Sequence, residues 1–270
     1  MAGSVQGSFN YVGPMNEEPL YFKHQPHRTN INYDSRVMEV HDIRAFDRPP
    51  TLAREGFALA RLRLDIGSER DPGAIDEVYH PAFHQLISEL TGARKVVVKR
   101  SMLRSSERAA QDARLDGVPA RYVHCDFDAA SFHAMAQAVL ADDPLKERWL
   151  SGRYAVVQGW RALSPPPQDT PLAVLDRQTL SREDLVHTGN IQGYEGAESR
   201  SDNYIYRYNP AHRWAYVSDM TEEDLLLFVG FDSADEGMAG TPHSSFDYWR
   251  SCDHTVPRAS CETRAFVYWG

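Results

Sequence analysis

The sequence predicts a mainly β domain, a β-barrel or jelly roll with helices packed on its outside, over residues 1–270. Three observations favour this fold class. Short runs of β-branched and aromatic residues recur along the second half of the chain. Helical patterns are confined to about 72–91 and 129–140. No repeat, low-complexity tract or linker-like segment divides the chain, and its length suits a single β domain with added helices.

The first third of the chain is expected to hold an arm, two strands and the longest helix. Residues 1–34 are rich in Asn, Pro, His and Tyr without a sustained period, so we expect an arm packed on the barrel, with one short strand near 20–22. Residues 36–40 look extended, and 56–66 alternate like a half-buried strand. The helix over 72–91 carries one apolar stripe at 3.6-residue spacing, between Asp71 as a plausible N-cap and Gly92 at its end.

Beyond that helix we expect mostly strands. A β-branched run at 95–99 predicts a central strand. Residues 103–117 are charged and poorly periodic, which predicts a surface loop or a frayed helix. The remaining expected strands are 120–124, 153–160, 172–175, 204–208, 214–217, 225–231 and 263–269.

Composition narrows the class of protein. The formal charge of −9 argues against a nucleic-acid partner, which would need a basic face to neutralise phosphates. No apolar run reaches the roughly 18 residues of a membrane span, and the first residues lack the basic and apolar regions of a secretory signal. The 3 cysteines show no C-x-x-C spacing, so neither a disulfide framework nor a zinc ribbon is expected. We therefore expect a cytoplasmic protein that binds neither nucleic acid nor a membrane.

Chemistry is concentrated in the triplet His124-Cys125-Asp126, at the end of a predicted strand. Residues i and i+2 of a strand project to the same face, so the imidazole and the carboxylate point to one spot. His243 lies further along, in Gly240-Thr241-Pro242-His243. Two histidines and one carboxylate form the facial triad of non-haem Fe(II) oxygenases, which leaves positions open for a keto acid and O₂. The triplet alone is weak, because such triplets also occur by chance.

Arginines downstream of His243 strengthen this interpretation. Arg258 and Ser260, two residues apart in the segment that leads into the last predicted strand, could bind the far carboxylate of 2-oxoglutarate through a guanidinium fork and a hydroxyl. Arg264 shares their face by parity, so either arginine could be the clamp, with Arg258 preferred. Each could instead be in a structural ion pair, for instance with Glu262.

Other polar residues have weaker claims to a functional role. Trp160 and Arg161 end a strand that should line the barrel, so they are candidates for binding substrate, although structural pairing of Arg161 is at least as plausible. His212 is expected to pack or form a hydrogen bond rather than bind a metal. Asp232 could orient a ligand, but a turn cap is favoured.

The order of these motifs from about Val37 onward resembles the hydroxylase/desaturase family that includes fungal gibberellin desaturase and the small component of the cephamycin methoxylation system. The stretches that carry the resemblance include Val123-His124-Cys125-Asp126, Gly159-Trp160-Arg161-Ala162-Leu163, Tyr208-Asn209-Pro210-Ala211-His212-Arg213-Trp214, Pro242-His243-Ser244-Ser245-Phe246 and Pro257-Arg258-Ala259-Ser260. The resemblance implies a double-stranded β-helix with Fe(II), O₂ and usually 2-oxoglutarate. It also implies hydroxylation, desaturation or ring formation on a secondary metabolite or amino-acid-derived small molecule.

Alternatives remain at this point. The same fold could use Fe(II) and O₂ without 2-oxoglutarate, or it could be a non-catalytic jelly-roll binding protein. A zinc hydrolase is more distant, since zinc also accepts histidine and carboxylate ligands. The substrate, the outcome of the reaction and the oligomeric state do not follow from the sequence.

Overall fold

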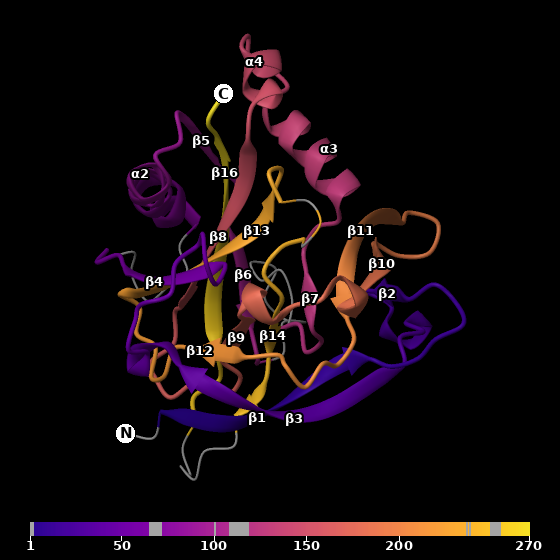
Figure 1. Cartoon of the computed structure of the whole chain (residues 1–270). Helices are drawn as coiled ribbons and strands as arrows, with labels where there is room; N and C mark the ends of the chain where they lie inside the picture. Colours follow the sequence, from indigo (N-terminus) through magenta and orange to yellow (C-terminus); the bar gives the residue numbers. More distant parts are fainter. Residues whose placement is uncertain are drawn as a thin grey trace.

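The structure, a computed structural model, describes residues 3–64, 72–99, 101–107, 119–235, 237, 239–248 and 255–270. Two β-sheets curl around a shared interior, and helices pack on their outside (Figure 1). This arrangement confirms the predicted jelly roll with peripheral helices.

The larger sheet has ten strands and includes the N-terminal segment. In spatial order they are β15 (Asp247–Tyr248), β1 (Ser4–Val12), β3 (Tyr33–Asp42), β12 (Trp214–Tyr216), β9 (Leu172–Leu175), β14 (His243–Ser245), β7 (His124–Cys125), β11 (Ser199–Tyr206), β10 (Leu185–Gln192) and β2 (Leu20–Phe22). Most neighbours run antiparallel, whereas β2 with β10 and β3 with β12 are parallel. Strands β7 and β14 lie side by side in the middle of this sheet, although they are far apart in the sequence.

The smaller sheet consists of long, mostly apolar strands. In spatial order they are β4 (Phe57–Arg61), β13 (Asp224–Asp232), β8 (Tyr154–Ala162), β16 (Ala259–Tyr268) and β5 (Lys95–Val98), and β6 (Met102–Ser105) also pairs with β16. A register shift between Val229 and Phe231 marks a β-bulge on β13, opposite β8. Because β8 and β13 are buried almost throughout, both of their faces must be covered.

One apolar cluster fills the space between the sheets. It brings Trp160 and Phe228 of the smaller sheet against Val174 and Ala215 of the larger one. A neighbouring cluster includes Phe9, whose ring stacks on that of Trp214 at 4.1 Å between centroids. The two clusters therefore join the two sheets, including the N-terminal strand β1, in one interior.

Helices cover the outer faces. A single π-helical turn, η3 (Ile75–Tyr79), follows the short α1 (Pro72–Ala74) and leads into α2 (His80–Thr91), which ends at Gly92 with a left-handed φ of 62°. Its apolar side packs on the smaller sheet. Helix α3 (Ala129–Val139) follows the first motif, capped by Asp128, and α4 (Lys146–Ser151) comes next. No helix among the described residues is long and apolar enough to cross a membrane.

Several predicted elements are confirmed and several need correction. Strands β5, β8, β9, β12, β13 and β16 and both long helices lie where the patterns predict them. Residues 1–34 differ from the expected arm because β1 is a regular strand of the larger sheet. Its alternation of buried and less buried residues is easy to overlook in the sequence, because Gly7 occupies one buried position without an apolar side chain. The prediction of a loop or frayed helix from residue 103 is wrong at its start, where β6 is a strand. Of the strand expected at 120–124, only the end is extended, as part of the two-residue β7. Strand β10 was not predicted. Asp71 and residues 108–117 lie outside the described part.

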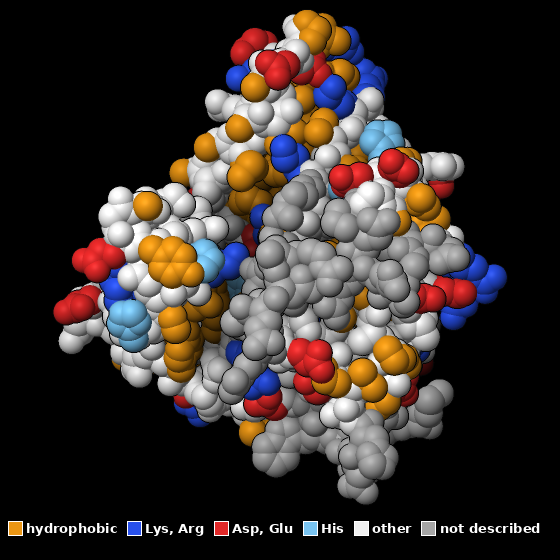
Figure 2. All heavy atoms as spheres, turned by 180° about the vertical axis from the view of Figure 1, so that it is seen from behind, with side chains coloured by type: hydrophobic (Ala, Val, Ile, Leu, Met, Phe, Trp, Pro, Cys, Tyr) orange, Lys and Arg blue, Asp and Glu red, His pale blue; other side chains and the backbone are white. Residues whose placement is uncertain are grey.

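The described surface carries charges of both signs. On the face seen from behind, acidic and basic side chains are interspersed with apolar ones (Figure 2).

Candidate metal centre

Two histidines and an aspartate from distant parts of the chain meet inside the barrel. His243, the first residue of β14, lies directly opposite His124 of β7, and their ring centroids are 4.5 Å apart. Asp126 follows β7, so it projects to the same side as His124. One potential ligand atom from each of the three residues lies within 4.8 Å of the other two. The group could therefore hold one metal ion, as the triplet and His243 predict.

Hydrogen bonds fix both imidazoles in the tautomer that a metal needs. Nδ1 of His124 lies 2.8 Å from the carbonyl oxygen of Tyr122, and Nδ1 of His243 lies 3.1 Å from that of Thr241. A carbonyl only accepts, so each Nδ1 must carry the proton and donate it. Each Nε2 then carries its lone pair toward the interior, which is the arrangement of metal-bound histidines whose other nitrogen donates to the protein.

Electrostatics also prepare the group for a cation. Burial, helped by the neighbouring His243, lowers the pKa of His124 to about 3, so its ring is neutral near neutral pH. Burial acts to raise the pKa of Asp126, but the adjacent guanidinium of Arg264 and the two histidines hold it well below its usual range. The neutral imidazole of His124, the imidazole of His243 and the partly buried carboxylate of Asp126 form a donor set that suits Fe(II).

The carboxylate of Asp126 is held by two donors. Nε2 of Gln158 lies 2.6 Å from Oδ2, and Nη2 of Arg264 forms an ion pair with the same oxygen at 3.0 Å. Both donors also reach Oε1 of Glu262, at 2.9 Å for Gln158 and 3.2 Å for Arg264. Arg264 is thus engaged by two carboxylates, which matches the alternative of a structural ion pair.

Arg258 lies in a different environment. It is 1% exposed, and its Nη1 donates to the carbonyl of Thr170 at 2.7 Å and to Oγ of Ser245 at 3.0 Å. Its guanidinium lies over the ring of Trp160, 5.2 Å from the centroid. No carboxylate among the described residues forms an ion pair with Arg258, and its buried Nε has no hydrogen-bond partner among them. Burial lowers the pKa of Arg258 to about 9. Binding of an anion beside this buried cation would offset the loss of its hydration.

A small cavity joins Arg258 to the metal group, the cluster of His124, Asp126 and His243. These three residues line the cavity together with Trp160 and Arg258. Ser245, two residues after His243 on β14, also lines this cavity. Because Ser245 and His243 are two residues apart, their side chains are expected on the same face of the strand. No functional role was predicted for Ser245.

The other predicted site residues divide between the two faces of the smaller sheet. Ser260 is buried opposite Ala162 but is not among the described residues that line this cavity. Arg161 faces the other side of the sheet, where its guanidinium lies over Tyr79 and donates to the carbonyl of Glu222. The structure therefore brings Trp160 to the metal group and leaves Arg161 outside it, because adjacent residues of a strand point to opposite faces.

A larger cavity of about 670 Å³ opens onto His124 and Asp126. One part of its wall is apolar and aromatic, with Tyr21, Tyr122, Phe127 and Met135. Polar side chains of β10 and β11 form another part, and Arg104 lines both cavities. Sequence reasoning missed Arg104, because its charged surroundings are typical of a loop.

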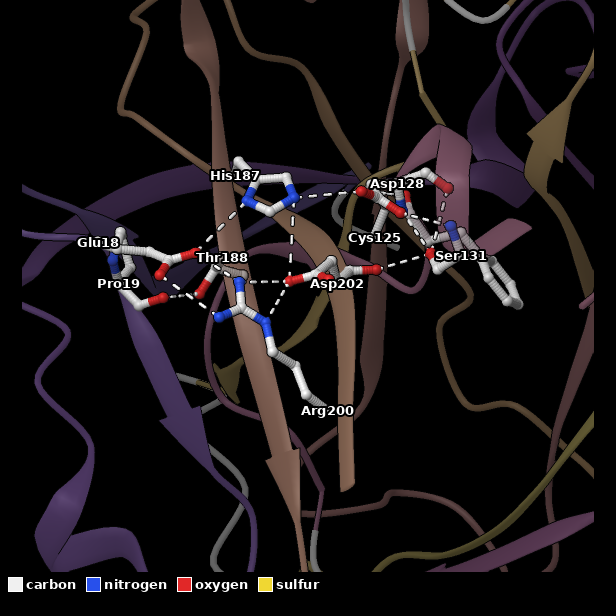
Figure 3. A network of polar contacts seen from close by, with 10 residues as sticks. Glu18, Pro19, Cys125, Asp128, Ser131, His187, Thr188, Arg200 and Asp202 are labelled. Atoms are coloured by element: carbon white, nitrogen blue, oxygen red, sulfur yellow. Dashed lines mark hydrogen bonds and ion pairs between the residues drawn. The ribbon is translucent and has the colours of Figure 1, made fainter. Parts of the chain in front are cut away.

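An ion-pair network supports the polar part of this wall (Figure 3). Arg200 of β11 joins Glu18 at 2.5 Å and Asp202 at 2.7 Å. Nε2 of His187 on β10 lies 3.1 Å from the carboxylate of Asp128, which caps α3. The network ties the N-terminal segment, the β10–β11 hairpin and α3 together around the cavity. Glu18, His187 and Asp202 could geometrically bind a cation, but Arg200 already neutralises both acids.

Two further interpretations from the sequence are confirmed. Nε2 of His212 bonds Asp184 at 3.1 Å, so this histidine is structural. Asp232 accepts from the backbone N–H of Ala234 and pairs with Arg153, as expected for a turn cap.

A jelly roll that encloses two histidines and an aspartate is the architecture of a mononuclear metal-dependent oxygenase. The chain belongs to the family described as an oxidoreductase/YMDC permease-like domain, whose model matches residues 9–268.

Named relatives agree with this class. A hydroxylase/desaturase, CTB9 of Cercospora beticola, is 30% identical over 257 residues, covering 88% of this chain and 78% of the relative. The Fe(II)/2-oxoglutarate-dependent dioxygenase nvfI of Aspergillus novofumigatus is 25% identical over 268 residues, covering 94% and 92%. The solved iron and alpha-ketoglutarate-dependent endoperoxidase NvfI superimposes over 100% of both chains with a TM-score of 0.83 at 24% identity, which confirms the fold. The resemblance to the hydroxylase/desaturase family is confirmed.

Proposed function

We propose that this protein is an Fe(II)- and 2-oxoglutarate-dependent dioxygenase that hydroxylates, desaturates or cyclises a small molecule by hydrogen abstraction. The observation that carries the proposal is the pairing of two sites in one cavity. The group of His124, Asp126 and His243 has the ligands and tautomers for Fe(II). Arg258, in the same cavity, is a buried cation that pairs with no anion among the described residues.

The three residues would hold the metal through both Nε2 atoms and the carboxylate. Fe(II) bound there supplies the activation of O₂ and the capacity to oxidise an unactivated carbon, while the protein supplies orientation. The protein's own contribution begins before the metal binds, because the carbonyls of Tyr122 and Thr241 hold the rings in place.

Arg258 would bind the far carboxylate of 2-oxoglutarate, with the Ser245 hydroxyl beside it. Nη1 is already fixed by Thr170 and Ser245, so the guanidinium is preorganised and little freedom remains to be lost on binding. Its competitor Arg264 is engaged by Asp126 and Glu262. We therefore assign the clamp to Arg258, and Ser260 stays a prediction.

The substrate would occupy the larger cavity. Its volume is about 670 Å³. Sites for small molecules usually measure from a few hundred to a thousand cubic ångströms, so the space suits such a ligand. Tyr122 lines this space beside His124 and Asp126. The centroid of its ring lies 4.5 Å from that of His124 and 4.7 Å from that of Tyr21. The aromatic wall would position an apolar carbon skeleton and exclude water from the reacting carbon.

A reducing compartment such as the cytoplasm suits this function. Cys125 and Cys261 are buried free thiols. Thiols persist in a reducing compartment, and Fe(II) is also retained best there.

The test is stoichiometric. Protein loaded with Fe(II) in the absence of O₂ is mixed with 2-oxoglutarate and O₂, and succinate is measured with and without candidate small molecules. The proposal expects succinate formation that requires Fe(II), rises with a true substrate and is lost in His243→Ala. Substrate oxidation without succinate would favour an oxidase of the same fold. Failure to bind metal would favour a non-catalytic binding protein.

A further inference from the structure

We propose that Gln158 is a positioning residue for the metal ligand Asp126, and that the β-bulge at Gly230 provides the room its side chain needs. The inference rests on the proposed function in one respect, namely that Asp126 binds the metal. Gln158 lies at the centre of β8 and is 0% exposed.

Gln158 has one orientation that its surroundings permit. Its amide nitrogen lies 2.6 Å from Oδ2 of Asp126 and 2.9 Å from Oε1 of Glu262. A primary amide has two N–H groups, so each carboxylate receives one. The flipped amide would place its oxygen against two carboxylate oxygens, which only accept. The amide is therefore fixed, and Asp126 is fixed with it.

Arg264 shares this task from the neighbouring strand. It lies directly opposite Gln158 in the β8–β16 register and contacts the same two carboxylates. Asp126 thus receives one neutral and one cationic donor on Oδ2. Donors of this kind set the direction of a ligating carboxylate, and their loss typically weakens metal binding about 10- to 100-fold.

The bulge on β13 makes this arrangement possible. Gly230 is the extra residue between Val229 and Phe231, where the pairing with β8 shifts register. A Cβ at Gly230 would lie 2.5 Å from Oε1 of Gln158, closer than side-chain atoms approach one another. Any other residue at this position would push the amide away from Asp126.

The same bulge seats the segment before His243. A Cβ at Gly240 would collide with the carbonyl oxygen of Gly230, so the two backbones touch. Next to this contact, the backbone N–H of Thr241 donates to the carbonyl of Val229 at 2.7 Å, and the carbonyl of Thr241 orients His243. Bulges often re-aim side chains beside functional sites. Here one bulge serves two ligands from two directions.

The test measures metal affinity without turnover. The full chain is titrated with Co(II) in the absence of 2-oxoglutarate, and the visible spectrum of the bound ion is recorded. Gln158→Met keeps the length of the side chain and removes both N–H donors. We expect its Co(II) affinity to fall roughly 10- to 100-fold with an altered spectrum. Gly230→Ala should shift affinity the same way, because its Cβ would displace the Gln158 amide, and the double variant should lose less than the sum of the two single losses, because the two changes share the hydrogen bond to Asp126.

Gln168→Met is the matched control. Gln168 is also buried, and its Nε2 donates to the carbonyls of Ser164 at 2.8 Å and Met220 at 2.9 Å, away from the metal group. It should lose stability and retain metal affinity. Unchanged affinity in folded Gln158→Met, or an equal loss in Gln168→Met, would overturn the inference while leaving the proposed function intact. A wild-type protein that binds no Co(II) would instead refute the metal site itself.

Discussion

Replacing Arg258 should abolish tight binding of 2-oxoglutarate while leaving the metal in place. The guanidinium is buried, and Thr170 and Ser245 hold only its Nη1. A bound carboxylate would therefore meet a preorganised cation in a site shielded from water. Removing one partner of such a buried charge pair costs about 2–5 kcal/mol. Since about 1.4 kcal/mol is tenfold, the expected loss of affinity is roughly 30- to 4,000-fold.

The assay is an anaerobic titration of Fe(II)-loaded protein with 2-oxoglutarate, followed by the visible absorption of the chelated keto acid. Arg258→Met should need far more 2-oxoglutarate for saturation, and Arg258→Lys should fall between it and the wild type, because lysine keeps the charge and loses the fork. Arg264→Met is the comparison, and it should weaken metal binding more than 2-oxoglutarate binding. If Arg264→Met lost 2-oxoglutarate and Arg258→Met retained it, the assignment of the clamp would be wrong.

Three further predictions concern the scaffold. Gly56 has a φ of 87°, and a Cβ there would lie 2.6 Å from Oγ1 of Thr241, so Gly56→Ala should lower both Tm and Co(II) affinity. The control Gly92→Ala, at a left-handed position in open space, should cost only backbone strain of about 1–2 kcal/mol and spare Co(II) binding. Burial lowers the pKa of His212, so the unfolded chain binds the proton first below about pH 6.5, and stability falls on acidification. In urea unfolding between about pH 5 and 7, His212→Gln should make the free energy of unfolding depend less steeply on pH, by at most about 1.4 kcal/mol per pH unit. An unchanged pH dependence would contradict this prediction. Replacing Phe9, whose ring stacks on that of Trp214, by Ala should lower the free energy of unfolding by about 3–5 kcal/mol. A smaller loss, measured by calorimetry, would mean that the neighbouring rings move in and fill the cavity.

The proximity of His124 and Asp126 could be predicted because its signal is local. His124 and Asp126 share a face through the i, i+2 relation, which holds although β7 is only two residues long. The same rule could have excluded Arg161 once Trp160 was taken to face inward. His243 came from the order of motifs along the chain, and its position opposite His124 needed the sheet.

The choice between two arginines could not be made from parity. Arg258 and Arg264 differ by an even number of residues, so both point inward. Only the register of β16 with β8 shows that Arg264 lies beside Gln158 and Asp126. Gln158 itself looked like one polar residue in an apolar strand, and its role depends on a bulge in a strand distant in sequence.

The measurement that tests the central claim most directly is anaerobic addition of Fe(II) and then 2-oxoglutarate to the full chain, with the metal content and the visible spectrum recorded together. We predict equimolar Fe(II) and a charge-transfer band that saturates with 2-oxoglutarate, with both lost in folded Asp126→Ala. A metal-replete wild type with a flat spectrum would remove 2-oxoglutarate from the account. Full metal binding and an unchanged band in Asp126→Ala would contradict the assignment of the metal centre.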